Sequence, residues 1–300
     1  MRLRELGLGV MLFSCIFAAA VPAQPGEPGA PRGTLFIVGG GTQPRELVRH
    51  FVDLAGGSGR ARIAILPMAS AGAEESGRGK AEQLRGMGAE AFVLNFTRAQ
   101  ANSDSIARRI ASATGIWFPG GDQGRLTDVL RGSATLRAIQ ARYREGAVIG
   151  GTSAGAAIMS DSMITGDQFR TGEDTSGYYG DEYTRIDRRT IVVVAGFGLL
   201  PGAIVDQHFV RRERHNRLLS VILERPSLLG VGIDEGTALR VDPDGTWGVE
   251  GASVAIIYDA RKAAITGPQA PHLGAASLLV HVLPAGSTFD PRTGRAQLPP

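Results

Sequence analysis

Cysteine is nearly absent from this chain of 300 residues, and its only thiol, Cys15, lies in an apolar N-terminal run. If that run is removed by cleavage after Ala23, the mature protein has no cysteine. This excludes a disulfide framework, a thiolate nucleophile and a cysteine-ligated metal. Lysine is also scarce, because Lys80 and Lys262 are the only two among 32 basic residues. The formal net charge of +3 is too small to indicate a nucleic-acid-binding protein.

The chain also lacks an apolar run long enough to predict a stable membrane span. Residues 9–20 are apolar but too short to cross a bilayer, and two arginines precede them. Val21-Pro22-Ala23 then ends in a small residue, as signal peptides do before the cleavage point. We therefore predict a secretory signal over residues 1–23 and a periplasmic or extracellular protein. The alternatives are an uncleaved anchor and a lipoprotein site at Cys15.

After the signal, the sequence predicts a linker and then one α/β domain. Residues 24–33 (QPGEPGAPRG) form a Pro/Gly linker with nothing to bury. From residue 34 to 300, strand-like and helix-like runs alternate, which predicts a doubly wound, mostly parallel sheet with helices on both faces and a few antiparallel C-terminal strands at one edge. The predicted strands lie at 34–38, 62–68, 91–96, 115–118, 190–195, 229–241, 246–259 and 276–283, the clearest predicted helices lie at 44–54, 80–87, 103–113 and 209–223, and 166–189 is predicted to be an inserted polar loop.

The chain is organised around the stretch AVIGGTSAGAAIMS at residues 147–160. Small and β-branched residues run into a glycine pair, Ser153 follows, and a helix-forming run comes next. This is a strand, a sharp turn and a helix with the pattern G-x-S-x-G, which pushes a serine hydroxyl out of the sheet. The backbone N–H of Ala154 at the helix start can point at a developing oxyanion. A glycine-rich connection with an incidental serine is the structural alternative, so a base and an orienting acid must be found.

His208 is the best candidate for the base among the five histidines. It ends a predicted strand, Gly202 to Gln207, and so lies at a carboxyl end that faces the same crevice as Ser153. A serine nucleophile needs such a base, and the base needs an orienting group. The acid must come from Asp206, Asp234 or Glu235, and the residues alone do not separate these carboxylates.

The triple glycine at 39–41 does not predict a nucleotide site, because it lacks both the G-x-G-x-x-G spacing and the Walker spacing. In an open α/β sheet, ligands bind at the carboxyl ends of the strands. We therefore expect the loops at Gly39–Gly41, at Pro119–Gln123 and at Ser153 to face one crevice.

At this point the motifs resemble those of the cyanophycinases, serine peptidases grouped with aspartyl dipeptidases in the class I glutamine-amidotransferase-like fold. D-Q-H-F with its following arginines is the most specific motif, the serine turn alone is the least, and together the motifs span nearly the whole mature chain. The matching stretches are FIVGGGT (36–42), WFPGGDQ (117–123), GGTSAGA (150–156), GLLPGAIVDQHF (198–209), RxRxxR (212–217) and GIDEGTAL (232–239).

The resemblance implies an acyl-transfer site. It implies Ser153 as nucleophile, His208 as base and Glu235 as acid, with the N–H groups of Ala154 and Gly121 at the oxyanion. No metal and no organic cofactor is implied. The substrate-binding residues that the resemblance implies are Gln123, Asp206, Gln207, Arg212, Arg214 and Arg217.

The implied substrate is cyanophycin, a polyaspartate with arginine on each side chain, cut to β-Asp-Arg dipeptides. Its branches carry a carboxylate, and we expect the arginines of the helix after His208 to bind it near the scissile bond: Arg214 and Arg217 on one face, with Arg212 displaced. The segment at 166–189 is longer than the family pattern leads us to expect, which leaves the pocket rim and the substrate size open. Its acidic residues Glu173, Asp174, Asp181 and Glu182 are candidates for the guanidinium, with Tyr178 and Tyr179 for stacking.

Two other functions remain open at this stage. One is an exopeptidase that acts on short aspartyl peptides, and the other is a catalytically silent binding protein on the same fold. No nucleic-acid partner and no stable membrane span are expected, and a homodimer is compatible with the sequence.

Overall fold

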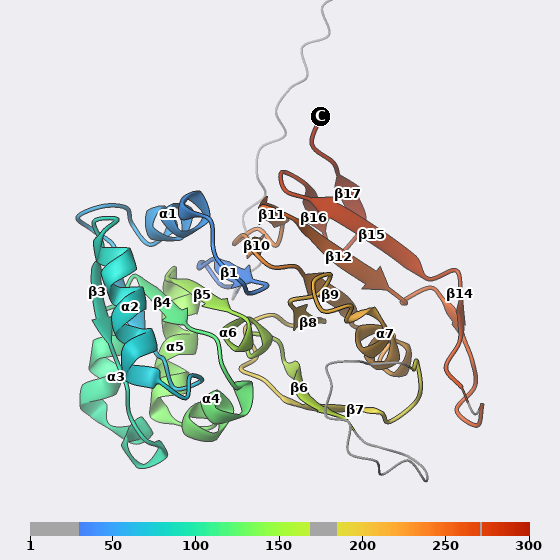
Figure 1. Cartoon of the computed structure of the whole chain (residues 1–300), viewed down its shortest axis with the longest axis horizontal. Coiled ribbons are helices and arrows are strands. Elements are labelled where there is room, and N and C mark those ends of the chain that lie inside the picture. Colours follow the sequence, from blue (N-terminus) through green and yellow to red (C-terminus); the bar gives the residue numbers. More distant parts are fainter. Residues whose placement is uncertain (1–29, 169–184, 271) are drawn as a thin grey trace, which may run out of the picture.

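The computed structural model describes residues 30–168, 185–270 and 272–300 (Figure 1). The helices are α1 (Arg45–Leu54), α2 (Ala73–Arg85), α3 (Asp104–Ala111), α4 (Gln123–Leu130), α5 (Ala134–Glu145), α6 (Ala154–Ala157) and α7 (His215–Glu224), with a 3-10 helix η1 (Arg98–Asn102). The strands are β1 (Leu35–Val38), β2 (Arg62–Ile65), β3 (Glu90–Val93), β4 (Gly115–Phe118), β5 (Val148–Thr152), β6 (Ser162–Gln168), β7 (Ile191–Ala195), β8 (Ala203–Gln207), β9 (Leu229–Ile233), β10 (Thr237–Val241), β11 (Trp247–Gly251), β12 (Val254–Asp259), β13 (Ala264–Ile265), β14 (Ala275–Ala276), β15 (Leu279–Pro284), β16 (Thr288–Asp290) and β17 (Arg295–Gln297).

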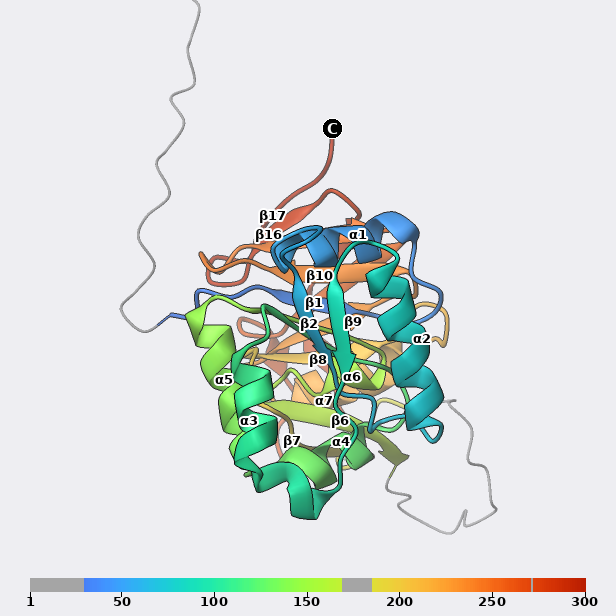
Figure 2. The same ribbon diagram turned by 90° about the vertical axis from the view of Figure 1, so that its left-hand side faces the viewer.

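A nine-stranded sheet with the order β17-β16-β11-β10-β1-β5-β4-β2-β3 forms the larger layer. Its strands β1, β5, β4, β2 and β3 pair in parallel. Helices α1 and α2 pack on one face of these strands, and α3, α4 and α5 pack on the other (Figures 1 and 2). The predicted doubly wound, mostly parallel sheet with helices on both faces is therefore confirmed.

The parallel strands are apolar along their whole length because helices cover both of their faces. All four residues of β1 are fully buried, with Leu35 and Ile37 on the α3–α5 side and Phe36 and Val38 on the α1–α2 side. Because β1, β5 and β4 pair in parallel, their carboxyl ends and the glycine-rich loops that follow lie together at one end of the strands.

The prediction that late antiparallel strands lie at one edge is confirmed for β10, β11, β16 and β17 of the large sheet, but β9, β12 and β15 form a second sheet with β8, in the order β15-β12-β9-β8. The predicted strand at 229–241 is in fact two strands, and they belong to different sheets: β9 pairs with β8 and β12, whereas β10 pairs with β1 and β11. The chain changes sheets at Asp234-Glu235-Gly236, where Gly236 has a φ of 65°. One buried apolar cluster nevertheless joins both sheets, since it contains Ile37, Val205 and Ile257.

The predicted helix at 209–223 starts six residues late, at His215. Residues 209–214 form turns instead, and Glu213 has a φ of 51°. The physical reason is the left-handed backbone of Glu213, which a right-handed helix cannot contain, while the Asp234 carboxylate holds the turn by accepting the N–H groups of Val210 and Arg211.

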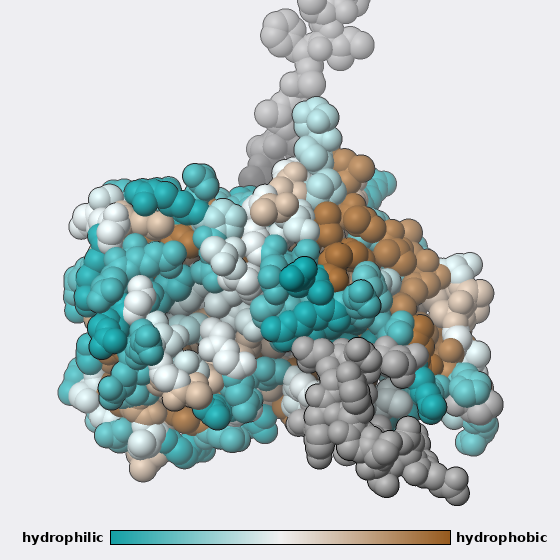
Figure 3. Space-filling view, viewed as in Figure 1, coloured by the Kyte–Doolittle hydropathy of each residue, from teal (hydrophilic) through white to brown (hydrophobic). Residues whose placement is uncertain are grey.

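The predicted inserted loop begins and ends in regular structure, since β6 and β7 pair as an antiparallel ribbon. Residues 169–184, which join them, lie outside the described part of the chain. Apolar side chains gather over the C-terminal strands (Figure 3), where Leu279, Val280 and Val282 of β15 are exposed. Among the described helices, none combines the length and the apolar character that a membrane crossing requires.

Candidate active site

Ser153 stands at the sharp turn between β5 and α6. Its φ of 55° and ψ of −114° are strained for a residue with a side chain, and its N–H donates to Val38 O at 3.0 Å. The glycines of the G-x-S-x-G pattern are needed for space rather than for flexibility. A Cβ on Gly151 would overlap the backbone of Gly155, and one on Gly155 would overlap Phe118 O. The turn therefore needs glycine at positions 151 and 155, and it presents the serine hydroxyl at the end of β5.

His208 follows β8 directly and faces Ser153. Its Nε2 lies 2.9 Å from Ser153 Oγ, and its Nδ1 lies 2.6 Å from Glu235 Oε1. The His208 N–H donates to Gly39 O at 2.6 Å, and the ring lies against Gly40, where any Cβ would overlap it. The structure thus brings Ser153, His208 and Glu235, which come from three different strand ends, into one hydrogen-bonded chain.

Asp234 and Glu235, which the residues alone could not separate, have different surroundings. Asp234 accepts hydrogen bonds from the N–H groups of Val210 (3.2 Å) and Arg211 (2.9 Å) and from Ser253 Oγ (2.8 Å). Burial alone would raise the pKa of Asp234, but these hydrogen bonds outweigh burial and hold that pKa below its usual range. Asp234 therefore fixes the turn after His208, and Glu235 is the carboxylate that faces the imidazole.

Burial lowers the pKa of His208 below its ordinary 6.5. The hydrogen bond that His208 Nδ1–H donates to Glu235 opposes this shift, and the positive charges of Arg212 and Arg214 add to it. The imidazole is consequently neutral at neutral pH, which is the form that can accept the proton of a serine hydroxyl.

We expect the pH profile of kcat/KM to show this shift. Activity should fall as the pH decreases through the pKa of His208, because protonation removes the base, and the midpoint of that acid limb should lie below 6.5. Steady-state rates between pH 4 and 8 would measure it. A midpoint above 6.5 would mean that the Glu235 carboxylate outweighs burial in the free enzyme.

The backbone N–H groups predicted to bind an oxyanion lie beside the serine. A Cβ on Gly120 would lie 3.2 Å from Ser153 Cβ, so the loop after β4 contacts the serine turn. The neighbouring Gly121 has a φ of 140° and packs against Ala69 O. Among the hydrogen bonds of the described residues, none uses the N–H of Gly120, Gly121 or Ala154. Their use by an oxyanion therefore stays a prediction.

Gln207 lies next to the nucleophile, whereas Arg214 lies behind Gln207. Gln207 Oε1 is 3.5 Å from Ser153 Oγ and accepts a hydrogen bond from Arg214 Nη1 at 2.9 Å. Arg214 is only 4% exposed. The guanidinium therefore orients Gln207, and its binding of a substrate carboxylate stays a prediction.

Asp206 and Arg217 form a buried ion pair rather than a substrate site. Arg217 is 1% exposed, its Nε donates to Asp206 Oδ2 at 2.6 Å, and its Nη2 pairs with Asp206 Oδ1. The prediction that Arg217 and Asp206 bind substrate is thus corrected. The cause is burial: a carboxylate inside β8 needs a cation, and α7 supplies one from its inward face.

We predict that Arg217→Ala destabilises the protein instead of weakening substrate binding. It would leave the Asp206 carboxylate buried and unpaired, which costs about 3–5 kcal/mol in the free energy of unfolding. Denaturant unfolding would measure this cost, with Arg211→Ala as the matched control on the exposed part of the same segment. A normal free energy of unfolding together with a raised KM would restore the substrate role.

Gln123 also has a structural position. It is 8% exposed, and its Nε2 donates to Ile164 O at 3.0 Å and to Thr165 O. The predicted contact of Gln123 with substrate is replaced by an anchor for β6. Arg212, by contrast, is exposed and close enough to His208 to influence its pKa. The acidic and tyrosine candidates of the inserted segment, residues 173–182, lie outside the described residues.

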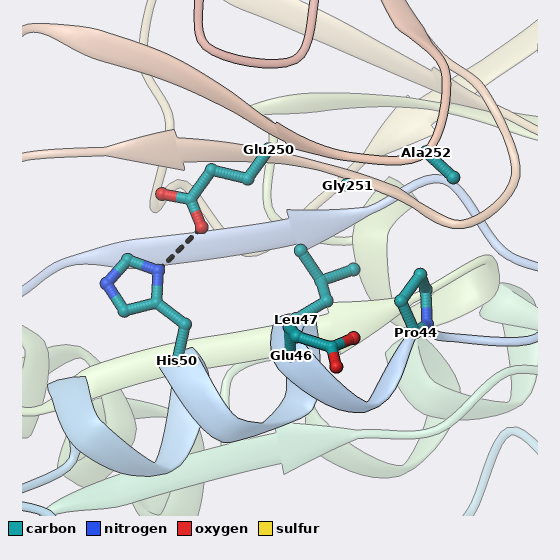
Figure 4. Close-up of a pocket in the computed structure, with 7 residues that line it drawn as sticks. All are labelled: Pro44, Glu46, Leu47, His50, Glu250, Gly251 and Ala252. Carbon is teal, nitrogen blue, oxygen red and sulfur yellow. Dashed lines mark hydrogen bonds and ion pairs between the residues drawn. The ribbon is translucent and has the colours of Figure 1, made fainter.

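The other four histidines have partners away from Ser153. His50 Nδ1 lies 2.6 Å from Glu250 Oε2 at the wall of a hollow of about 480 Å³, and this hollow contains none of Ser153, His208 and Glu235 (Figure 4). His215 contacts Tyr258 OH at 2.7 Å, His281 packs on Phe289, and His272 pairs with Asp187. Within the described ranges, no group of three His, Cys, Asp or Glu side chains is arranged to hold a metal ion.

The sequence interpretation missed what Gly40 and Gly41 do. A Cβ on Gly41 would lie 2.7 Å from Glu235 Oε2, so these glycines form the wall against which Glu235 and the His208 ring rest. The signal was present as the triple glycine, which the sequence placed at the crevice without linking it to His208 or Glu235. The sequence around Ser253, whose hydroxyl donates to Asp234, contained no motif that predicted this contact.

A family model described as peptidase family S51 matches residues 35–247. The chain is 33% identical over 274 residues to a cyanophycinase of Trichormus variabilis, covering 87% of both proteins, and 32% identical over 283 residues to one of Synechococcus elongatus, covering 90% of this chain and 84% of that relative. A solved peptidase from an acI-B1 Actinobacterium superposes with a TM-score of 0.58 at 20% identity, covers 85% of this chain and 98% of that one, and supports the fold. The chain belongs to peptidase family S51 and is a serine-type peptidase.

Proposed function

We propose that this protein is a secreted cyanophycinase that cuts the polyaspartate backbone of cyanophycin to β-Asp-Arg dipeptides through a Ser-His-Glu triad. The observation that carries the proposal is the chain from Ser153 Oγ to His208 Nε2 at 2.9 Å and from His208 Nδ1 to Glu235 Oε1 at 2.6 Å. Both distances lie within hydrogen-bond reach, as a nucleophile, a base and an orienting acid require. The cyanophycinases among its relatives support the choice of substrate.

In this mechanism His208 Nε2 accepts the proton of Ser153 Oγ as the oxygen attacks the substrate carbonyl. Glu235 holds the ring through Nδ1–H and stabilises the imidazolium that forms. The N–H groups of Ala154 and Gly121 donate to the oxyanion of the tetrahedral intermediate. His208 then gives its proton to the leaving amine, and water hydrolyses the acyl ester in the same manner.

For the substrate, we propose Arg212 as the residue that binds the carboxylate of an arginine branch. It is the one exposed arginine of the three that the sequence suggested, and its charge acts on His208. An arginine near the scissile bond suits the two oxygens of a carboxylate.

Secretion and the domain bounds are further parts of the proposal. Residues 1–23 are the signal, 24–33 the linker and 34–300 the peptidase domain, and export would give access to polymer released by other cells. N-terminal sequencing of the exported protein tests this, with Gln24 expected as the first residue. A homodimer stays a prediction for light scattering to test.

The decisive experiment incubates the purified mature protein with insoluble cyanophycin and identifies the soluble products by mass spectrometry. β-Asp-Arg is expected. Cleavage of short aspartyl peptides without any attack on the polymer would favour the exopeptidase function. Binding of the polymer without products, and without fluorophosphonate labelling of Ser153, would favour a silent binding protein.

A further inference from the structure

Lys80 is one of only two lysines in a chain whose other 30 basic residues are arginines. The other lysine, Lys262, is exposed, whereas Lys80 is half-buried on α2. Its Nζ lies 4.4 Å from the centre of the Trp117 ring, which is 1% exposed. A cation over the face of a buried tryptophan is attracted to the ring. The other cations that lie over aromatic rings among the described residues are guanidinium groups, those of Arg62 and Arg109 over Phe92.

The three donors of the ammonium are all accounted for. Nζ donates to Gln43 Oε1 and to Gln83 Oε1, both at 2.7 Å, and its third side faces the Trp117 ring. The ammonium is therefore engaged with its neighbours and is not directed at a ligand.

Gln43 connects Lys80 to the carboxyl end of β5 and to the loop after β1. Its Nε2 donates to Thr152 Oγ1 and to Gly41 O, each at 3.3 Å. Since an ammonium can only donate, Lys80 forces the amide oxygen of Gln43 towards itself and the amide nitrogen towards Thr152 and Gly41. Lys80 thus determines which way the Gln43 amide points.

Both ends of this contact belong to the site of the proposed function. Thr152 directly precedes Ser153, and Gly41 supports Glu235. Through these two hydrogen bonds, the Gln43 amide links the turn that carries the nucleophile to the loop that supports the acid. A small displacement of either loop would lengthen the contacts of His208, and a misplacement of about 1 Å can cost about a hundredfold in rate.

We propose that Lys80 is a positioning residue of this peptidase: through Gln43 it holds the Gly39–Gly41 loop and Thr152 in the register that aligns Glu235, His208 and Ser153. The proposal rests on the proposed function. Lys80 contacts neither substrate nor reacting atoms, so its effect falls on kcat rather than on KM.

The charge of Lys80 is lost within a measurable pH range. Burial lowers the pKa of Lys80 to about 8 and is the cause of the shift. Among the described residues, no charged side chain forms a hydrogen bond or ion pair with Lys80 Nζ. The titratable and charged residues on the elements around Lys80 are Arg45, Glu46, Arg49, His50 and Asp53 on α1, Arg62 on β2, Glu74, Glu75, Arg78, Glu82 and Arg85 on α2, and Glu90 on β3. Above about pH 8 the ammonium becomes neutral, the attraction to Trp117 is lost, and kcat should fall.

The test compares Lys80→Met with the matched control Lys262→Met in the mature protein. We expect Lys80→Met to lower kcat and the rate of fluorophosphonate labelling of Ser153 by roughly tenfold to a hundredfold with KM unchanged, and Lys262→Met to match the wild type. Lys80→Arg keeps a charge that does not titrate, so it should recover part of kcat and abolish the decline above about pH 8. Unchanged kcat in Lys80→Met, or a change in KM alone, would overturn the proposal.

Gln43 gives a second, independent test if Lys80→Met does not fold. Gln43→Glu keeps a partner for Lys80 but cannot donate to Thr152 or Gly41, so it should show the same loss in kcat. Gln43→Leu and Lys80→Met combined should lose no more than either alone, because both break one contact chain. Additive losses would refute the relay. Activity in Ser153→Ala would refute the proposed function instead, and an inactive Ser153→Ala beside an unaffected Lys80→Met would refute only the role of Lys80.

Discussion

Ser153→Ala is expected to fold normally and to lose about a million-fold in kcat. Among the described residues, the Ser153 hydroxyl is the group that forms a hydrogen bond with His208 Nε2, at 2.9 Å, so its removal leaves the base without a nucleophile. Folding should survive, because alanine meets the same strain as serine at a φ of 55° and the lost hydrogen bonds are at most partly buried.

Cyanophycin hydrolysis and thermal unfolding of Ser153→Ala, measured on the same preparation, give the result. The midpoint of thermal unfolding should match that of the wild type. The loss of activity would then come from the missing nucleophile and not from unfolding. A near-normal rate in protein free of wild-type contamination would remove the serine mechanism, together with the roles of His208 and Glu235.

Glu235→Gln is expected to lower kcat by up to about ten-thousandfold, whereas Asp234→Asn should change it only a few fold. A neutral amide at 235 cannot stabilise the imidazolium, and it can present its NH2 group to Nδ1 and so stabilise the wrong tautomer. Asp234 does not contact the ring, so its replacement weakens the turn that carries Val210 and Arg211 and costs about 1–3 kcal/mol of folding free energy.

The two variants are each other's control, since they sit side by side and make the same chemical change. Measuring kcat and the free energy of unfolding for both should show a crossed pattern: activity lost in Glu235→Gln and stability lost in Asp234→Asn. The reverse ranking in kcat would transfer the orienting role to Asp234.

The sequence by itself determined the parallel part of the fold and the residue types of the site. Apolar strands and glycine turns are local signals, because β1, β4 and β5 are buried on both faces and must be apolar throughout. The serine turn is likewise local, since the close approach of Gly151 to Gly155 needs only neighbouring residues. Such features could therefore be predicted, and the resemblance of the motifs to cyanophycinases added the family.

Only the tertiary structure decided which polar groups face the crevice. Asp234 and Glu235 are adjacent in the chain, yet Asp234 holds the turn at Val210 and Arg211 whereas Glu235 contacts His208. Their side chains diverge because they lie in the short connection between β9 and β10, where the chain passes from one sheet to the other. Arg217 is of a residue type that binds carboxylates, but its side chain points inward and pairs with Asp206, eleven residues earlier in the chain.

The proposed role of Lys80 likewise could not be predicted from the sequence, because its contacts join residues that are far apart in the chain. Its effect on the site depends on Gln43, 37 residues away, and on Thr152, 109 residues from Gln43. A hydrogen-bond chain of this kind leaves no period or motif in the sequence, because it depends on where side chains end after the sheet has formed. Local patterns are set by neighbours in the chain, whereas the partner of a buried charge is set by packing, and that difference separates what could be predicted here from what could not.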